Sequence, residues 1–436
     1  MKKTFRPWQV DQSLLLPPSV HDFVPADHPA HFVRDLVRET LDLSAIVESY
    51  DEARGYPPYD PWMMTAQLLY GYSRGVYSSR RLAQACEERV DFMAVTALNR
   101  PDFRTIAVFR RRHLAALAGL FEQVLVLCCK AGLVRLGHVA LDGTKVKANA
   151  SRHKAMSYAR MSKAEPELAA QIAEWFAAAE AADAAEDTAL GADRRGDELP
   201  GWVADKQKRL AKIREAKAAL EAEAKAAAEE KAKRPKKYRG GRKPKTPPGE
   251  PKAGAQRNFT DPESRIMKAK DGFIQGYNAQ AAVDAAQQVI VAQGLTDNAA
   301  DSGQLVPLLD AIDTVIGRKP REVSADVGYC SEANLKALED RRIRGYVATG
   351  RQKRPASGER QRHGPLVEAM RQRLKRAGRR SRYRLRKQVV EPVFGQLKEA
   401  RGFRQFLMRG IDKVRAEWAL LCTVHNILKL RKAPAP

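Results

Sequence analysis

The sequence predicts a mixed α/β fold in which a sheet, interrupted after its first strand by a helical and basic insertion, follows an all-α domain. Three observations support this. Residues 1–135 carry helix-type patterns, β-like runs occur at 138–147 and again only from 276 onwards, and the stretch between them is rich in Ala, Glu and Lys. With 436 residues and 44% hydrophobic side chains, the chain is long enough for two or three domains with real cores.

The first domain, 1–135, is predicted to be a compact set of helices. Apolar side chains surround a helix that begins at Pro61, and Ser78 and Asp102 are plausible N-caps of two further helices. The helix after Asp102 ends in arginines that include Arg110 and Arg111. Short helices with terminal arginines suit a helix-turn-helix-like DNA reader, and an ordinary helical bundle with surface arginines fits the composition equally well.

The rest of the chain is predicted to hold one sheet and its insertion. The insertion, 153–269, begins with exposed helices over 154–232, which could form a hairpin, and continues with a mobile basic loop over 233–257. The sheet domain, 136–152 and 270–432, has further predicted elements in this order: a hairpin of 276–284 and 288–295, a helix at 303–316, a strand at 322–326, a helix at 331–342, a strand at 346–349, and a helical C-terminal third.

Positive charge is concentrated in two segments. The net charge is +25, with 77 Lys+Arg against 52 Asp+Glu, and 201–257 and 341–387 carry net charges of +11 and +16. Clustered positive charge indicates a polyanionic partner, nucleic acid first, because each neutralised phosphate releases counterions. A solvated basic surface is the alternative for either segment alone.

The sequence also constrains the compartment. We find no apolar run long enough for a transmembrane helix and no signal core behind the first lysines, so we expect a cytoplasmic, nucleoid-associated protein with no membrane partner. The five cysteines lack a Cys-x-x-Cys pair and are expected to be reduced thiols.

Three carboxylates have a context that suggests chemistry. Asp142 lies on the first strand, Asp326 ends the central strand, and Glu391 stands near the start of a C-terminal helix. Carboxylate oxygens are the ligands of Mg²⁺, and two such ions can activate a nucleophile and stabilise a leaving oxygen at phosphorus. Any one of these acids alone is more often a strand-end or capping residue.

Four motifs in this order resemble the DDE transposases of bacterial insertion sequences. They are the segment from Leu141 to Ser151, Gly276 to Gln280, Ser324 to Tyr329, and Tyr383 to Arg409; the helices around Pro101 to Arg110 resemble the DNA-binding domain of that family. The resemblance implies a ribonuclease-H-like sheet. It also implies Asp142, Asp326 and Glu391 as the catalytic, metal-binding triad, with Mg²⁺ as the ion and Mn²⁺ as an alternative.

The resemblance also implies residues that contact DNA. In the glutamate signature of a subgroup, Tyr383 and Arg386 match and Lys398 follows Glu391 at the right spacing, but four residues separate Arg386 from Glu391 and Lys387 stands at the strict position. Pro392 predicts Glu391 at the helix entry rather than in its interior. The implied DNA contacts are Lys398, Arg386, Lys387, Tyr383, Lys145, Lys147, Arg110 and Arg111.

The function implied is a transposase that binds the terminal inverted repeats of a mobile element and catalyses metal-dependent cleavage and strand transfer. Its partners would be double-stranded DNA, both element ends and target, and a second copy of the chain in the DNA complex. Two other functions stay open at this point: a stand-alone DNA nuclease of the same fold, and a DNA-binding regulator whose acids are structural.

Overall fold

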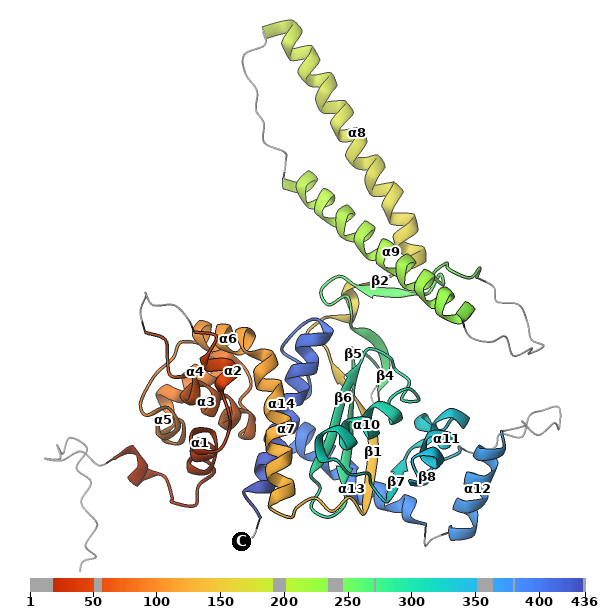
Figure 1. The fold of residues 1–436 in the computed structure, drawn as a ribbon. Helices are drawn as coiled ribbons and strands as arrows, with labels where there is room; N and C mark the ends of the chain where they lie inside the picture. Colours follow the sequence, from red (N-terminus) through yellow and green to blue (C-terminus); the bar gives the residue numbers. More distant parts are fainter. Residues whose placement is uncertain are drawn as a thin grey trace, which may run out of the picture.

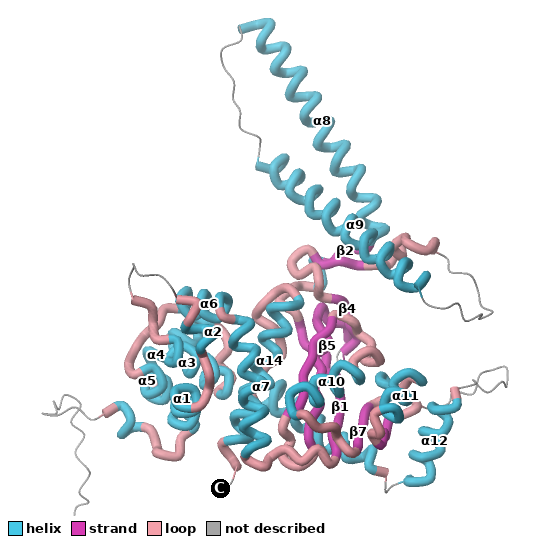
Figure 2. Tube along the Cα trace, viewed as in Figure 1, coloured by secondary structure: helices cyan, strands magenta, loops and turns pink. Residues whose placement is uncertain are grey.

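The computed structural model describes residues 19–50, 57–190, 201–233, 246–269, 272–350, 364–378 and 381–433. It shows a helical N-terminal region, a central mixed sheet and a projecting helical hairpin (Figure 1). In Figure 2 the strands occupy the central body, with a short pair at the base of the hairpin, and the N-terminal region is helical.

The N-terminal helices begin where capping residues predict them to begin. Asp60 accepts from the Met63 N–H, Ser78 from the Arg81 N–H, and Asp102 from the N–H groups of Arg104 and Thr105. The helices are α1 (Pro29–Glu39), α2 (Ser44–Val47), α3 (Pro61–Ser73), α4 (Ser79–Glu88), α5 (Val90–Thr96), α6 (Phe103–Arg112) and α7 (Leu114–Lys130), preceded by the 3₁₀ turn η1 (Val20–Phe23).

The main sheet has three antiparallel and two parallel strand pairings. Strand β5 pairs with β1, β4 and β6, all antiparallel, whereas β1 pairs with β7 and β7 with β8 in parallel. The strands β6, β5, β1, β7 and β8 therefore lie in that order, with β1 in the middle. Their bounds are β1 (His138–Lys147), β4 (Arg265–Ala269), β5 (Gly272–Asp284), β6 (Ile290–Thr296), β7 (Glu322–Ala325) and β8 (Arg344–Val347).

Helices connect and cover the strands. They are α10 (Leu305–Ile316), α11 (Glu332–Asp340), α12 (Pro365–Ala377), α13 (Leu385–Gly395) and α14 (Ile411–Leu430); shorter turns are η2 (Arg152–Lys154), η3 (Val327–Tyr329), η5 (Arg382–Arg384) and the π-helical η6 (Gln396–Ala400). Helix α14 lies against both α7 and β6, so one apolar core runs from the N-terminal helices into the sheet. The division at residue 135 thus stays a prediction.

The insertion forms a hairpin of α8 (Tyr158–Leu190) and α9 (Gly201–Lys233), as its composition predicts. Met161 on α8 packs with Ile213 and Leu220 on α9 in a small separate cluster. At its base, β2 (Ala155–Ser157) pairs with β3 (Gln256–Asn258), two short strands that the sequence pattern did not indicate. About half of the basic loop predicted over 233–257, residues 234–245, lies outside the described residues, and Lys233 ends α9 while Gln256 and Arg257 belong to β3.

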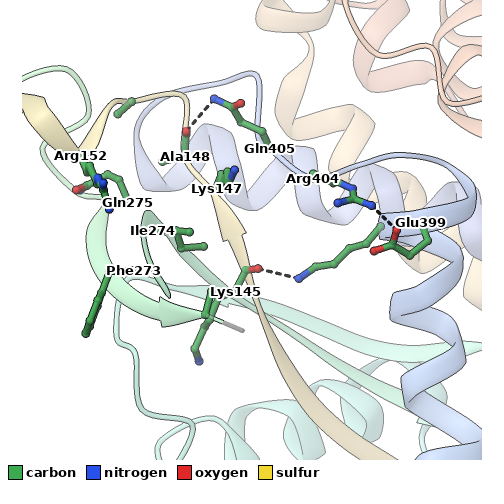
Figure 3. A pocket seen from close by; sticks show the side chains of 13 residues that line it. Lys145, Lys147, Ala148, Arg152, Phe273, Ile274, Gln275, Glu399, Arg404 and Gln405 are labelled. Carbon is green, nitrogen blue, oxygen red and sulfur yellow. Dashed lines mark hydrogen bonds and ion pairs between the residues drawn. The ribbon is translucent and has the colours of Figure 1, made fainter. Parts of the chain in front are cut away.

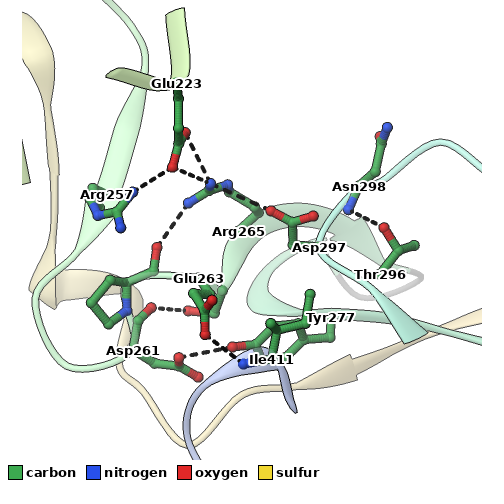
Figure 4. Close-up of polar contacts among 12 residues, drawn as sticks. Glu223, Arg257, Asp261, Glu263, Arg265, Tyr277, Thr296, Asp297, Asn298 and Ile411 are labelled. Carbon is green, nitrogen blue, oxygen red and sulfur yellow. Dashed lines mark hydrogen bonds and ion pairs between the residues drawn. The ribbon is translucent and has the colours of Figure 1, made fainter. Parts of the chain in front are cut away.

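Polar contacts fasten this base to the sheet domain (Figure 4). Glu223 on α9 pairs with Arg257 at 2.5 Å and with Arg265 at 3.0 Å, and Arg265 also reaches Asp297 at 3.4 Å. Below them Asp261 accepts hydrogen bonds from the Tyr277 hydroxyl and from the backbone N–H of residue 410. The insertion is therefore tied to β4, β5 and the start of α14.

None of the described helices is by itself long and apolar enough to cross a membrane. The pair α6 and α7 reaches that length only together, and these two helices meet at an angle of 70°.

Candidate active site

Asp142 and Asp326 lie side by side on the two central parallel strands. Leu141 on β1 is in register with Ala325 on β7, so the next residue along each strand direction is an aspartate: Asp142 within β1, and Asp326 directly after β7. Asp326 caps the turn η3 by accepting the Gly328 N–H at 2.7 Å. The Asp142 side chain is only 15% exposed and accepts the Gly143 N–H at 2.9 Å.

Glu391 belongs to α13, which packs against β1. The prediction that Pro392 would place Glu391 at the helix entry is wrong, because α13 begins at Leu385 and continues to Gly395. Proline cannot donate to the carbonyl four residues earlier, that of Gln388. Here the Gln288 side-chain amide donates to the Gln388 oxygen at 3.0 Å, so the carbonyl left free by Pro392 keeps a partner.

Arg386 joins two of the three acids. Its Nη1 lies 2.5 Å from Asp142 Oδ2 and its Nη2 lies 3.1 Å from Glu391 Oε1. Arg386 is 13% exposed, so this guanidinium is a largely buried cation between two carboxylates. Tyr383, on η5, also makes a side-chain hydrogen bond with Arg386.

The electrostatics of Asp142 reflect this setting. Burial raises the pKa of Asp142 to about 6, and the Arg386 guanidinium opposes the rise, while the neighbouring Asp326 and Asp301 carboxylates add to it. A buried carboxylate next to other carboxylates favours the bound proton or a cation. The site therefore carries more negative charge than Arg386 balances.

The donor chemistry fits a hard divalent cation, although the present arrangement is not a finished ligand set. Carboxylate oxygens from neighbouring strands are what Mg²⁺ and Mn²⁺ require. Among the residues that the structure describes, no group of three or more His, Cys, Asp or Glu side chains is arranged to hold a metal ion. Arg386 stands between Asp142 and Glu391, where a shared cation would also find its ligands.

A basic hollow of about 650 Å³ opens further along β1 from Asp142, where Lys145 and Lys147 line it (Figure 3). Its cationic lining residues are Lys145, Lys147, Arg152, Lys398 and Arg404. Lys398, from η6, donates to the Lys145 carbonyl at 2.8 Å rather than to Glu391, and burial lowers the pKa of its ammonium. Arg404 pairs with Glu399, the acid in this lining.

Two arginines on α6 were predicted to contact DNA, and the structure gives them different surroundings. Arg110 is 8% exposed, and its guanidinium donates to the Tyr72 hydroxyl at 3.1 Å and to the Tyr77 carbonyl at 2.8 Å. Arg111 is exposed and lines a second hollow with Arg409 and Lys413. The inward geometry of Arg110 favours a structural role, because both of its Nη atoms already donate within the protein.

The structure thus brings together some of the predicted residues and not others. Asp142, Asp326, Glu391, Arg386 and Tyr383 belong to one acidic site, and Lys145, Lys147 and Lys398 line the adjoining hollow. Lys387 is exposed on α13. Of the basic segment 341–387, residues 351–363 and 379–380 lie outside the described part of the chain.

Sequence reasoning missed Asp301, which lies after β6 in a polar loop without a recognisable motif. It accepts a hydrogen bond from the Asn278 side chain at 2.7 Å and from the Gln280 side chain at 2.8 Å. Both amides lie in the Gly276 to Gln280 motif, so the motif identified the donors but not the acid that they hold.

Comparisons with known families identify the family of the chain. The family model described as "Transposase DDE domain" matches residues 225–427, and the one described as "Transposase domain (DUF772)" matches residues 18–112. No curated protein and no solved structure gives a significant match. The second match covers the N-terminal region up to the end of α6, and the first covers β4 to β8, Asp326, Glu391 and most of α14. The chain belongs to the DDE transposases of insertion sequences, enzymes that cleave DNA and transfer its strands.

Proposed function

We propose that the sheet is ribonuclease-H-like and that Asp142, Asp326 and Glu391 hold the divalent metal of this transposase, Mg²⁺ with Mn²⁺ as an alternative. The observation that carries the proposal is the register of β1 and β7, which sets Asp142 beside Asp326 while Arg386 links Asp142 to Glu391. The strand order, with three antiparallel strands followed by two parallel ones, supports the fold assignment.

The reaction consists of two displacements at phosphorus. A water attacks the phosphodiester at the element end, and the freed 3′-hydroxyl then attacks a phosphodiester of target DNA. A divalent metal held there would lower the pKa of the nucleophile and neutralise charge on the leaving oxygen. Asp142, Asp326 and Glu391 supply its oxygen ligands, and Arg386, once it no longer bridges Asp142 and Glu391, donates to the scissile phosphate.

The DNA strand enters through the basic hollow. Lys145 and Lys147 alternate with Val146 on β1, so both project from the same side of the strand, where Lys398 and Arg404 join them. These cations neutralise phosphates and position the strand without reading its sequence. Tyr383 orients Arg386. Lys387 contacts the phosphate backbone of the DNA from its exposed position on α13.

Recognition of the terminal inverted repeats belongs to the N-terminal helices. Arg111 and the exposed side of α4 and α6 contact the repeat, while Arg110 holds α6 in place through Tyr72 and Tyr77. Two copies of the chain, one for each element end, form the DNA complex at the nucleoid. The transposase families matched by the chain give no support to a regulator or to a stand-alone nuclease.

The test uses the full-length protein and a supercoiled plasmid that carries both ends of the element. Asp142→Asn, Asp326→Asn and Glu391→Gln should each abolish strand cleavage in Mg²⁺ and in Mn²⁺ and should leave binding to an end duplex within about twofold. Asp310→Asn, which changes an exposed acid on α10, is the matched control and should cleave normally. Normal cleavage by any triad variant removes that residue from the site.

A further inference from the structure

A second basic hollow lies at the base of the helical hairpin, between the turn η2, the two helices and the segment that follows β3. Its volume is about 650 Å³. Its lysine and arginine side chains are all exposed, and so is Asp205, the one acid among the described residues that line it. The cations are Lys154, Arg160, Lys208, Arg209 and Lys212.

The packing of α9 directs three of these cations to the hollow. Lys208 and Lys212 are four residues apart, so they lie on one face of the helix, and Arg209 adjoins them. Leu210 and Ile213 alternate with them in sequence and are buried. The apolar contacts that hold the hairpin together therefore fix the basic face of α9 as well.

The cations of this hollow lack the acidic partners that other cations of the hairpin have. Arg214 and Lys217 both pair with Glu165, at 3.2 and 2.9 Å, and Arg257 pairs with Glu223. Within the described part of the chain, no ion pair or side-chain hydrogen bond engages Lys154, Arg160, Lys208, Arg209 or Lys212. Like charges gathered in this way attract a multivalent anion.

The turn η2 connects this hollow to the basic hollow along β1. Arg152, the first residue of η2, lines the hollow along β1, and the next two residues, His153 and Lys154, line the one at the hairpin. A polyanion that lies in the first hollow and continues past η2 thus meets a second set of cations. Duplex DNA is such a polyanion, with one negative charge for about every 1.7 Å of its axis.

We propose that the hollow at the hairpin base is a second DNA site, which binds the phosphate backbone of the duplex where it continues beyond the first hollow. The inference rests on the proposed function, since it extends the DNA path that Lys145 and Lys398 begin. Lysine and arginine contacts to phosphates position a duplex without reading its bases, so this site accepts any sequence.

The test measures binding of the full-length protein to a long duplex that carries the element end, by fluorescence anisotropy over a range of salt concentrations. Replacing Lys208, Arg209 and Lys212 together by Gln should reduce the slope of log affinity against log salt concentration by about 3, roughly one for each phosphate contact. The matched control replaces Lys225, Lys231 and Lys233 by Gln, which removes the same charge from exposed positions of α9 outside the hollow and should keep the wild-type slope.

The outcomes separate this inference from the proposed function. If the hollow variant keeps the wild-type slope while Lys147→Gln with Arg404→Gln reduces it, the inference is refuted and the DNA path through the first hollow stands. If neither variant changes the slope, the proposed DNA path itself is wrong. An equal loss in the control variant would also overturn the inference, because the contact would then be spread along α9.

A variant that should bind more tightly excludes misfolding as the cause of a loss. Asp205→Asn removes the acid from the hollow, so it should increase the affinity for the same duplex by about two- to fivefold at low salt, the effect of one surface charge interaction. Unchanged or weaker binding by Asp205→Asn would contradict the inference.

Discussion

Glu417 is a fully buried acid on α14 whose replacement should make the stability of the protein less dependent on pH. Its carboxylate accepts the backbone N–H groups of Leu407, at 3.0 Å, and Met408, at 3.2 Å. It thereby holds the segment 403–409, from which Phe406 donates to the Lys147 carbonyl beside the basic hollow. Burial raises the pKa of Glu417 from 4.5 to about 7, although these amides and Arg110 oppose the rise.

The sign and size of the effect follow from this pKa. Because the folded pKa lies above the unfolded one, the protonated form stabilises the fold fully below pH 4.5, and that contribution is lost as the pH rises through about 7. At about 1.4 kcal/mol for each pH unit, ionised Glu417 lowers the free energy of unfolding at pH 8 by about 3 kcal/mol. Glu417→Gln accepts the same hydrogen bonds without a charge.

The assay is urea unfolding of the wild type and Glu417→Gln at pH 5 and pH 8, followed by circular dichroism. The free energy of unfolding of the variant, relative to the wild type, should increase by about 3 kcal/mol between the two pH values. A constant offset from the loss of the carboxylate does not affect this difference. If the relative stability is the same at both pH values, Glu417 is not a strained buried acid and the reasoning fails.

Three further predictions concern cations. Arg386→Gln removes the cation between Asp142 and Glu391, so Mg²⁺ should raise the melting temperature of this variant more than that of the wild type; equal shifts in the two proteins would contradict the bridging role. Replacing both Lys147 and Arg404 by Gln should reduce the slope of log affinity for duplex DNA against log salt concentration by about 2, one for each phosphate contact. An unchanged slope would show that these two side chains face solvent and do not contact phosphates. Arg110→Ala should lower the free energy of unfolding by about 1–3 kcal/mol, because it leaves buried oxygens without donors. Arg111→Ala should instead weaken binding to the element end with no change in melting temperature. The opposite pattern would mean that Arg111 is the structural arginine and Arg110 the DNA contact.

Local patterns in the sequence were sufficient for the order of most elements, but not for the short strands β2, β3 and β4. The caps at Ser78, Asp102 and Ser331 act within three residues, and each begins a helix near where it was predicted. The hairpin of β5 and β6 and the helical insertion also follow from short-range periodicity. Asp142 within β1 and Asp326 after β7 could be chosen because a carboxylate on an apolar strand or at its end is conspicuous in sequence.

Only the tertiary structure decided which distant groups meet. Pro392 stays inside α13 because the side chain of Gln288, about a hundred residues earlier, replaces the missing donor. Arg110 and Arg111 are adjacent in sequence, yet packing against Tyr72 and Tyr77 turns one inward and leaves the other exposed.

The sequence by itself determined the fold class, the family and the three candidate acids, because these depend on periodicity, capping and motif order along the chain. It did not determine which residues surround those acids. Arg386 reaches Asp142 from another element, and Asp301 comes to lie beside Gly143 and Gly328 from a loop without a motif. Such contacts depend on how the strands and α13 pack in three dimensions, and no pattern of neighbouring residues encodes them.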